Sequence, residues 1–142
     1  MLFVFAAAAL MVSLPARARD DRLHFPIGDA LTSADAKAKL DPKIFLSFGG
    51  QKHAPPTKVF GTYTANKKTN FFNKKDKEGC EWAFLSAVLS LQARARESGG
   101  NAVVNIKSVY KDVEFVSDTQ YECGAGNVVG GVALRGDVVV LR

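Results

Sequence analysis

The chain has 142 residues, of which 47% are hydrophobic and 23% are charged, and its formal net charge is +5. This composition excludes a disordered chain, because apolar residues are abundant enough to form a core, and no internal repeat suggests a fibrous protein. Its length after processing is that of one domain.

An apolar run from Leu2 to Val12 opens the chain and is followed by Ala16-Arg17-Ala18. The run is shorter than the ~20 residues that a membrane-spanning helix needs, and small residues at 16 and 18 fit the −3 and −1 positions of a signal peptidase site. No Lys or Arg precedes the run, so only the terminal amine supplies the usual positive charge. We therefore predict a signal peptide over residues 1–18 and a single exported domain, periplasmic or secreted and without a membrane span, over residues 19–142.

Three short elements are expected in the first half of that domain. Ser33 to Leu40 has a helical pattern that Pro42 stops. Ile44 to Phe48 and Lys58 to Thr64 have the composition of strands, with Gly and Pro pairs between them.

Positive charge gathers between Lys58 and Lys77, where six lysines accompany one acidic residue, Asp76. Aromatic residues lie among these lysines, a combination that binds polyanions such as lipopolysaccharide phosphates, anionic lipid or single-stranded nucleic acid. The candidate anion-binding residues are Lys67, Lys68, Lys74, Lys75 and Lys77. The alternative is a solvated loop whose Phe71 and Phe72 pack into the core.

The pattern from Asp76 to Ser98 predicts a long helix that a sheet must cover. Its apolar residues recur at steps of three and four, and others widen the face: Cys80, Ala83, Phe84, Ala87, Val88, Leu91 and Ala95, then Trp82, Leu85 and Leu89. Asn73 or Asp76 is expected to cap its start, and Gly99-Gly100 to end it.

Three strands are predicted after this helix. The first runs from Ala102 to Tyr110, with Ala102, Val104 and Ile106 on one face. A turn at Lys111-Asp112 is expected to lead into an antiparallel strand from Val113 to Cys123. After a glycine-rich link, Val132 to Leu141 forms the last strand, with an irregularity at Gly136.

The order β-β-α-β-β-β, with one long helix packed on a mostly antiparallel sheet of four to five strands, predicts an α+β fold. Cys80 and Cys123 are the only cysteines, and in an exported chain they favour one disulfide over free thiols or metal ligands. In the chain-entropy model, closing that loop stabilises the domain by roughly 4 kcal/mol.

The sequence contains no complete enzyme motif among those considered. The glycine spacing of Gly131 to Val138 is that of a P-loop, but Asp137 and Val138 stand where Lys and Ser/Thr would bind phosphate and magnesium. His24 and His53 are isolated, so neither a metal ligand set nor a general base with a partner is indicated. We expect no cofactor and no nucleotide.

Three segments resemble two small families. They are Cys80-Glu81-Trp82-Ala83-Phe84, the helix end from Ala93 into Val104, and Gly136 to Val140. The segments are similar to the YbjQ-like family, the so-called heavy-metal-binding domain, and to the Rcs envelope-stress sensor lipoprotein. The resemblance spans roughly Val59 to Leu141. The second family implies a link between a helix Cys and a Cys on a later strand; from the first, no ligand set transfers to matching positions.

We therefore expect a non-enzymatic exported module of the cell envelope that binds, senses or supports structure. Its expected partner is an envelope protein or an anionic envelope polymer, and a homo-oligomer remains open. The alternative function is handling of zinc or copper in the periplasm. A pocket holding His24 or His53 beside a carboxylate would instead favour a hydrolase.

Overall fold

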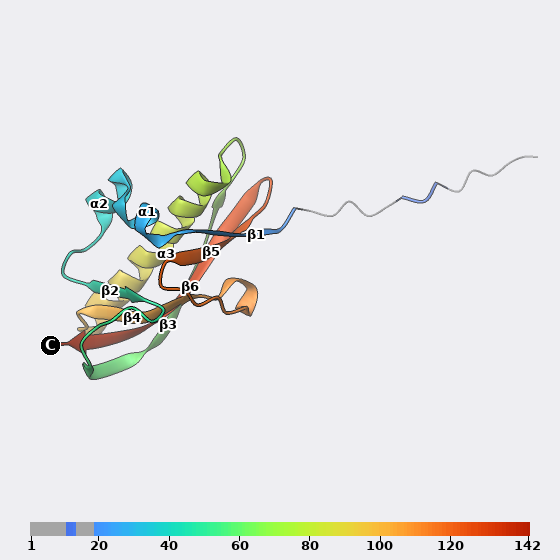
Figure 1. The fold of residues 1–142 in the computed structure, drawn as a ribbon. Coiled ribbons are helices and arrows are strands. Elements are labelled where there is room, and N and C mark those ends of the chain that lie inside the picture. Colours follow the sequence, from blue (N-terminus) through green and yellow to red (C-terminus); the bar gives the residue numbers. More distant parts are fainter. Residues whose placement is uncertain (1–10, 14–18) are drawn as a thin grey trace, which may run out of the picture.

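The computed structural model describes residues 11–13 and 19–142 (Figure 1). The predicted signal peptide therefore lies outside the described residues, except for 11–13, which are exposed and have no regular secondary structure.

The described part of the chain contains six strands, three α-helices and one 3-10 turn. In order they are β1 (Asp21–Pro26), α1 (Ile27–Thr32), α2 (Ala34–Lys39), β2 (Phe45–Phe48), β3 (Pro56–Asn70), α3 (Asp76–Ser98), β4 (Ala102–Ser108), a short 3-10 turn (Tyr110–Asp112), β5 (Gln120–Ala125) and β6 (Val129–Leu141). This is an α+β fold, as predicted, with six strands instead of four to five.

The long strand β6 is the centre of the sheet. Along one side it pairs with β3 over its whole length, and along the other it pairs with β4 and β5 at different ends. β1 extends the sheet beyond β5, and β2 extends it beyond β4. Only the β2–β4 pair is parallel, so the sheet is mostly antiparallel.

Helix α3 covers one face of this sheet, and the main core lies between them (Figure 1). All seven residues predicted at the three- and four-residue steps are buried, and so is Leu85. Trp82 is an exception, since 47% of it is exposed. Gly99 ends α3 in the left-handed conformation with φ 87°, as the glycine pair indicated.

The start of α3 differs from the expectation. Its N-cap is Lys75, which makes no side-chain hydrogen bond to the first turn, and Asn73 has a left-handed φ of 58°. Neither Asn73 nor Asp76 is the N-cap, because the chain leaves β3 through a tight turn that uses Asn73 to change direction.

The disulfide joins Cys80 on α3 to Cys123 on β5, with 5.8 Å between the Cα atoms. Both residues are fully buried beneath the helix. The bond thus fixes the first part of α3 over the side of the sheet to which β1 and β5 belong.

Strand β4 does not keep the alternation that was predicted for it. Val103 and Ile106 face the main core under α3, whereas Ala102 and Val104 belong to a second cluster. The cause is Asn105, whose φ is 52° and which lies at a break in the β4–β6 register. An extra residue at this bulge moves the side chains after it to the other face.

The expected irregularity at Gly136 therefore belongs to β4, the strand opposite it. The break falls between Val104 and Lys107, while β6 keeps an unbroken register with β3 past Gly136. A Cβ on Gly136 would lie 2.7 Å from Cγ1 of Val103, so the bulge needs a glycine across from it.

The predicted hairpin after β4 is wrong. Lys111 and Asp112 do form a turn, with φ values of 49° and 61°, but one isolated bridge, Ser108 to Phe115, is the pairing that follows it. β5 begins at Gln120 and pairs with β1 and β6. Strand β1, which pairs with β5, was not predicted.

Candidate functional site

Two turns meet at one end of the sheet, at the top of Figure 1. Residues 71–75 connect β3 to α3, and residues 126–128 connect β5 to β6. The backbone N–H of Phe71 donates to the carbonyl of Val128 over 2.7 Å, and the N–H of Gly126 donates to the carbonyl of Val129 over 3.1 Å. The first bond joins the two turns, and the second closes the turn between β5 and β6.

Apolar side chains project from both turns. Phe72 is 62% exposed, Val128 is 64% exposed and Val129 is 55% exposed. Large apolar side chains exposed on two turns that are hydrogen-bonded to each other are candidates for a binding surface, whereas single exposed ones are ordinary. We call these three residues, together with Arg19, Lys67, Lys68, Lys74 and Lys75, the basic tip.

Phe71 and Phe72 have opposite environments. Phe71 is 3% exposed, because its ring fits against two glycines: a Cβ on Gly79 would lie 2.7 Å from the ring, and a Cβ on Gly130 would lie 2.6 Å from it. Phe72 follows it directly and points away from the core. The alternative in which both rings pack inside is therefore wrong for Phe72.

The lysines predicted for anion binding are exposed, but they do not all lie together. Lys67 and Lys68 are consecutive in β3, so their side chains leave the sheet on opposite faces. Lys74 and Lys75 lie in the turn beside Phe72. Of the four, Lys68 lines a hollow together with Val129.

Lys77 is separated from this group by its ion pairs. Its Nζ lies 2.8 Å from an Oδ2 of Asp29 in α1 and 3.9 Å from Glu81 one turn further along α3. The hydrogen bond from Lys77 to Asp29 raises the pKa of Lys77. Its charge thus links α1 to α3 and is not available to an external anion in the way the other four are.

Arg19, at the start of the described domain, belongs to the basic tip by its position, but its charge, like that of Lys77, is offset by carboxylates. Its guanidinium donates to Asp76 at the start of α3 and, over 2.7 Å, to Asp21. These two carboxylates raise the pKa of Arg19, with the hydrogen bond to Asp76 as the larger cause. Arg19 also lines a shallow hollow together with residues 126–129, so the chain enters the domain beside the exposed valines.

A second hollow of about 250 Å³ adjoins the first on the side of Lys68. Lys68, Lys111 and Arg19 bring three cations to it. Two of them are offset: Arg19 by Asp21 and Asp76, and Lys111 by Asp20, to whose Oδ2 it donates over 2.7 Å, which lowers the pKa of Asp20. Among the described residues, Lys68 has no ion-pair partner within 4.0 Å.

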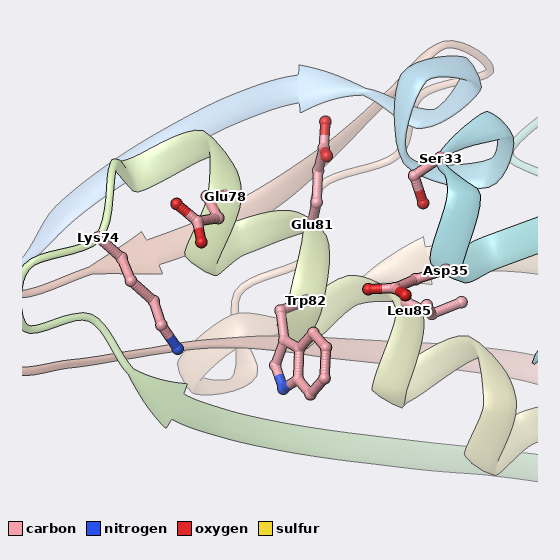
Figure 2. A pocket seen from close by; sticks show the side chains of 7 residues that line it. All are labelled: Ser33, Asp35, Lys74, Glu78, Glu81, Trp82 and Leu85. Carbon is pink, nitrogen blue, oxygen red and sulfur yellow. The ribbon is translucent and has the colours of Figure 1, made fainter.

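A hollow of about 220 Å³ between α2 and α3 has the opposite character (Figure 2). It is lined by Ser33, Asp35, Lys74, Glu78, Glu81, Trp82 and Leu85. Ser33 and Asp35 approach it from the start of α2, and the other residues come from α3 and the turn before it. The exposed Trp82 ring has the Lys39 ammonium 4.8 Å from its centroid. This side of the domain is acidic, so the positive surface ends at Lys74.

His24 does have a carboxylate beside it. Its Nε2 lies 3.0 Å from Oε2 of Glu122, and its ring stacks on Phe115 with the centroids 4.0 Å apart. Arg22 contacts the other oxygen of Glu122 over 3.4 Å. His24 lines none of the four hollows described here, which are lined by Trp82, Lys68, Val128 and Phe45 respectively.

Within residues 11–13 and 19–142, no three His, Cys, Asp or Glu side chains are grouped so that they could hold a metal ion. In the same part of the chain, no helix is both long and apolar enough to cross a membrane. The chain matches no protein-family model, no curated protein and no solved structure.

Proposed function

We propose that the chain is a non-enzymatic, exported module of the cell envelope that binds an anionic membrane surface through the basic tip. The observation that carries this proposal is the exposure of Phe72, Val128 and Val129 on two turns joined by a backbone hydrogen bond, with exposed lysines in the same segments of the chain. Apolar side chains that enter a headgroup layer and cations that meet its phosphates are the two contributions that together give stable attachment to a surface.

The expected binding free energies indicate that charge and apolar contact act together. A Lys or Arg close to an anionic leaflet contributes about 1 kcal/mol, so the four exposed lysines supply the larger part of the binding energy. One Phe and two Val side chains add a contribution of similar order when they leave water. Neither contribution alone would hold a domain of this size at the surface.

The start of α3 lies at the same place. Its first-turn N–H groups receive no side-chain cap from Lys75, and Asp76 and Glu78 in the first turn already meet the partial positive charge of the helix N-terminus. The attraction to an anionic surface therefore comes from the lysines of the basic tip.

Export of the protein is consistent with a binding surface at the basic tip. The disulfide suits an oxidising compartment. If the signal peptide is removed after Ala18, the new amine of Arg19 lies beside residues 126–129 and adds one charge to the basic tip. Processing would then strengthen the surface that we propose to be the binding site.

Replacing Lys67, Lys68, Lys74 and Lys75 together with Gln tests the proposal. We expect binding to phosphatidylglycerol vesicles at low salt to weaken by about a hundredfold or more, because each lysine contributes about 1 kcal/mol. Binding by the parent should fall steeply as salt rises and screens these solvated charges. The melting temperature should change little, because exposed lysines contribute little to stability. Vesicle co-sedimentation across a salt series measures the effect.

The matched control removes four exposed cations at the opposite end of the sheet. These are Lys43, Lys52, Lys58 and Arg142, two of which line a hollow beside the end of β6. This variant has the same net charge as the first but an intact basic tip. Equal loss of binding in both variants would mean that total charge matters and the tip does not, which contradicts the proposal.

A further inference from the structure

The free edge of β3 is a second surface with a definite geometry. Among the described strands, β3 pairs with β6 alone, so its other side faces away from the sheet. Its register with β6 is broken twice before Gly61 and then runs without a break from Thr62 to Asn70. The second half of β3 is therefore a regular, straight edge.

The backbone groups on this edge lack partners. In an antiparallel ladder, alternate residues point their N–H and C=O groups to opposite sides, so half of those in residues 62–70 point away from β6. Apart from the ladder with β6, no described residue donates to or accepts from the backbone of residues 62–69. Water is their only partner, and an added strand would satisfy them.

The other two edges of the sheet are less suited to an added strand. β1 has six residues and ends in Pro26, which has no N–H to donate. β2 has four residues, and its pairing with β4 is irregular between Leu46 and Phe48. Residues 62–70 contain no proline and no bulge, and they form the longest regular edge in the described sheet.

The charges on this edge define the kind of strand that fits it. Lys67 and Lys68 lie in it, Lys74 and Lys75 follow it, and no acidic residue occurs between positions 56 and 75. A second copy that paired antiparallel over residues 62–70 would place Lys67 opposite Ala65 and Lys68 opposite Thr64, so the two Lys67 side chains would be diagonal neighbours on one face and neither lysine would meet a carboxylate. An extended segment with acidic side chains would meet both lysines favourably.

We propose that the free edge of β3, over residues 62–70, binds an extended acidic segment of a partner protein by strand addition. The main-chain hydrogen bonds supply the affinity, and Lys67 and Lys68, which project to opposite faces, read carboxylates at neighbouring positions of the segment. This interaction uses the edge of β3 and does not require Phe72, Val128 or Val129. It shares Lys67 and Lys68 with the basic tip, so variants of Phe72 are the ones that distinguish it from the membrane-surface proposal.

The test uses the purified exported protein and a blocked peptide as long as residues 62–70, in which two consecutive Glu residues lie among Val and Thr residues, so that one carboxylate faces each side of the sheet. Amide hydrogen exchange should show protection of alternate, outward-facing amides in residues 62–70 when the peptide is added. The same peptide with methyl groups on alternate backbone nitrogens keeps its charge but cannot complete the ladder, so it should bind about tenfold more weakly or worse. A peptide with Lys in place of Glu should not compete.

Two variants separate this inference from the proposed function. Lys67→Glu combined with Lys68→Glu should transfer the preference from the Glu peptide to the Lys peptide. Phe72→Ser should leave peptide binding unchanged while it weakens vesicle binding. Equal binding of the methylated peptide, protection at β1 or β2 in place of β3, or dimers at the concentrations used would each overturn the assignment.

Discussion

Replacing Cys80 and Cys123 together with alanine should lower the free energy of unfolding by about 4 kcal/mol, which is a large share of the stability of a domain of this size. The two residues are 43 positions apart, and the bond between them encloses all but the first few residues of α3 and the whole of β4. In the chain-entropy model, opening a loop of this length lets the unfolded chain regain the corresponding entropy.

Alanine is the appropriate replacement because both cysteines are completely buried, and a serine hydroxyl would be placed there without a partner. Urea unfolding followed by tryptophan fluorescence measures the change, since Trp82 is the only tryptophan in the chain. The reduced parent protein serves as the control and should lose as much stability as the variant. An unchanged unfolding midpoint in both would contradict the account of the core.

Phe71 and Phe72 provide the second large effect, as a pair of neighbouring residues with opposite roles. Phe71→Ala should destabilise the domain by about 3 to 5 kcal/mol, because it removes a buried ring that packs against Gly79 and Gly130. Phe72→Ala should change stability by only about 0.5 kcal/mol, since that ring is mostly in water.

The two substitutions should have the reverse order of effect on vesicle binding. Phe72→Ala should weaken binding to phosphatidylglycerol vesicles several-fold, because an apolar side chain no longer enters the surface. Phe71→Ala, studied at a temperature where it is folded, should bind as the parent does. If Phe72→Ala proved as destabilising as Phe71→Ala, the exposed position of Phe72 would be wrong, and so would the basic tip.

The long helix could be predicted from sequence because its signals are local and agree with one another. The apolar residues from Cys80 to Ala95 follow the period of a helix, and Gly99 supplies the left-handed residue that ends it. Its bounds, Asp76 to Ser98, are those observed. Trp82 was misplaced because periodicity identifies an apolar face without showing how far the sheet beneath extends.

The elements that were missed depend on contacts distant in sequence. β1 is six residues long, carries Asp21, Arg22 and His24, and is a strand because β5, about a hundred residues later, pairs with it. α1 is a short helix with Gly28 inside it, and its packing of Ile27 and Ala30 into the core maintains it. Neither segment has a strong local preference, so a sequence pattern gives little indication of either.

The bulge in β4 was missed for a different reason. Val103, Val104 and Ile106 form an apolar run in which either face can be buried, and the reversal depends on the conformation of Asn105 alone. Asparagine is among the few non-glycine residues that adopt a positive φ readily, but this tendency is too weak to locate a bulge without the opposite strand.

The charged part of the candidate site was visible in the sequence, whereas its apolar part was not. Lysine clustering between Lys58 and Lys77 is a local property of composition. The contact of that segment with Val128 and Val129 depends on the β3–β6 pairing, and Arg19 reaches it through Asp76, 57 positions away. The ion pair that removes Lys77 from the group also needs the missed helix α1.

A tryptophan at position 72, in a protein whose own Trp82 is replaced with Phe, tests the central claim most directly. With phosphatidylglycerol vesicles at low salt, the fluorescence of the Phe72→Trp, Trp82→Phe protein should shift to the blue and should be quenched by brominated lipid chains. Both effects should disappear with phosphatidylcholine vesicles or at high salt. A spectrum that stays that of a water-exposed indole, with no quenching while the protein is bound, would contradict the claim that this tip meets the membrane surface.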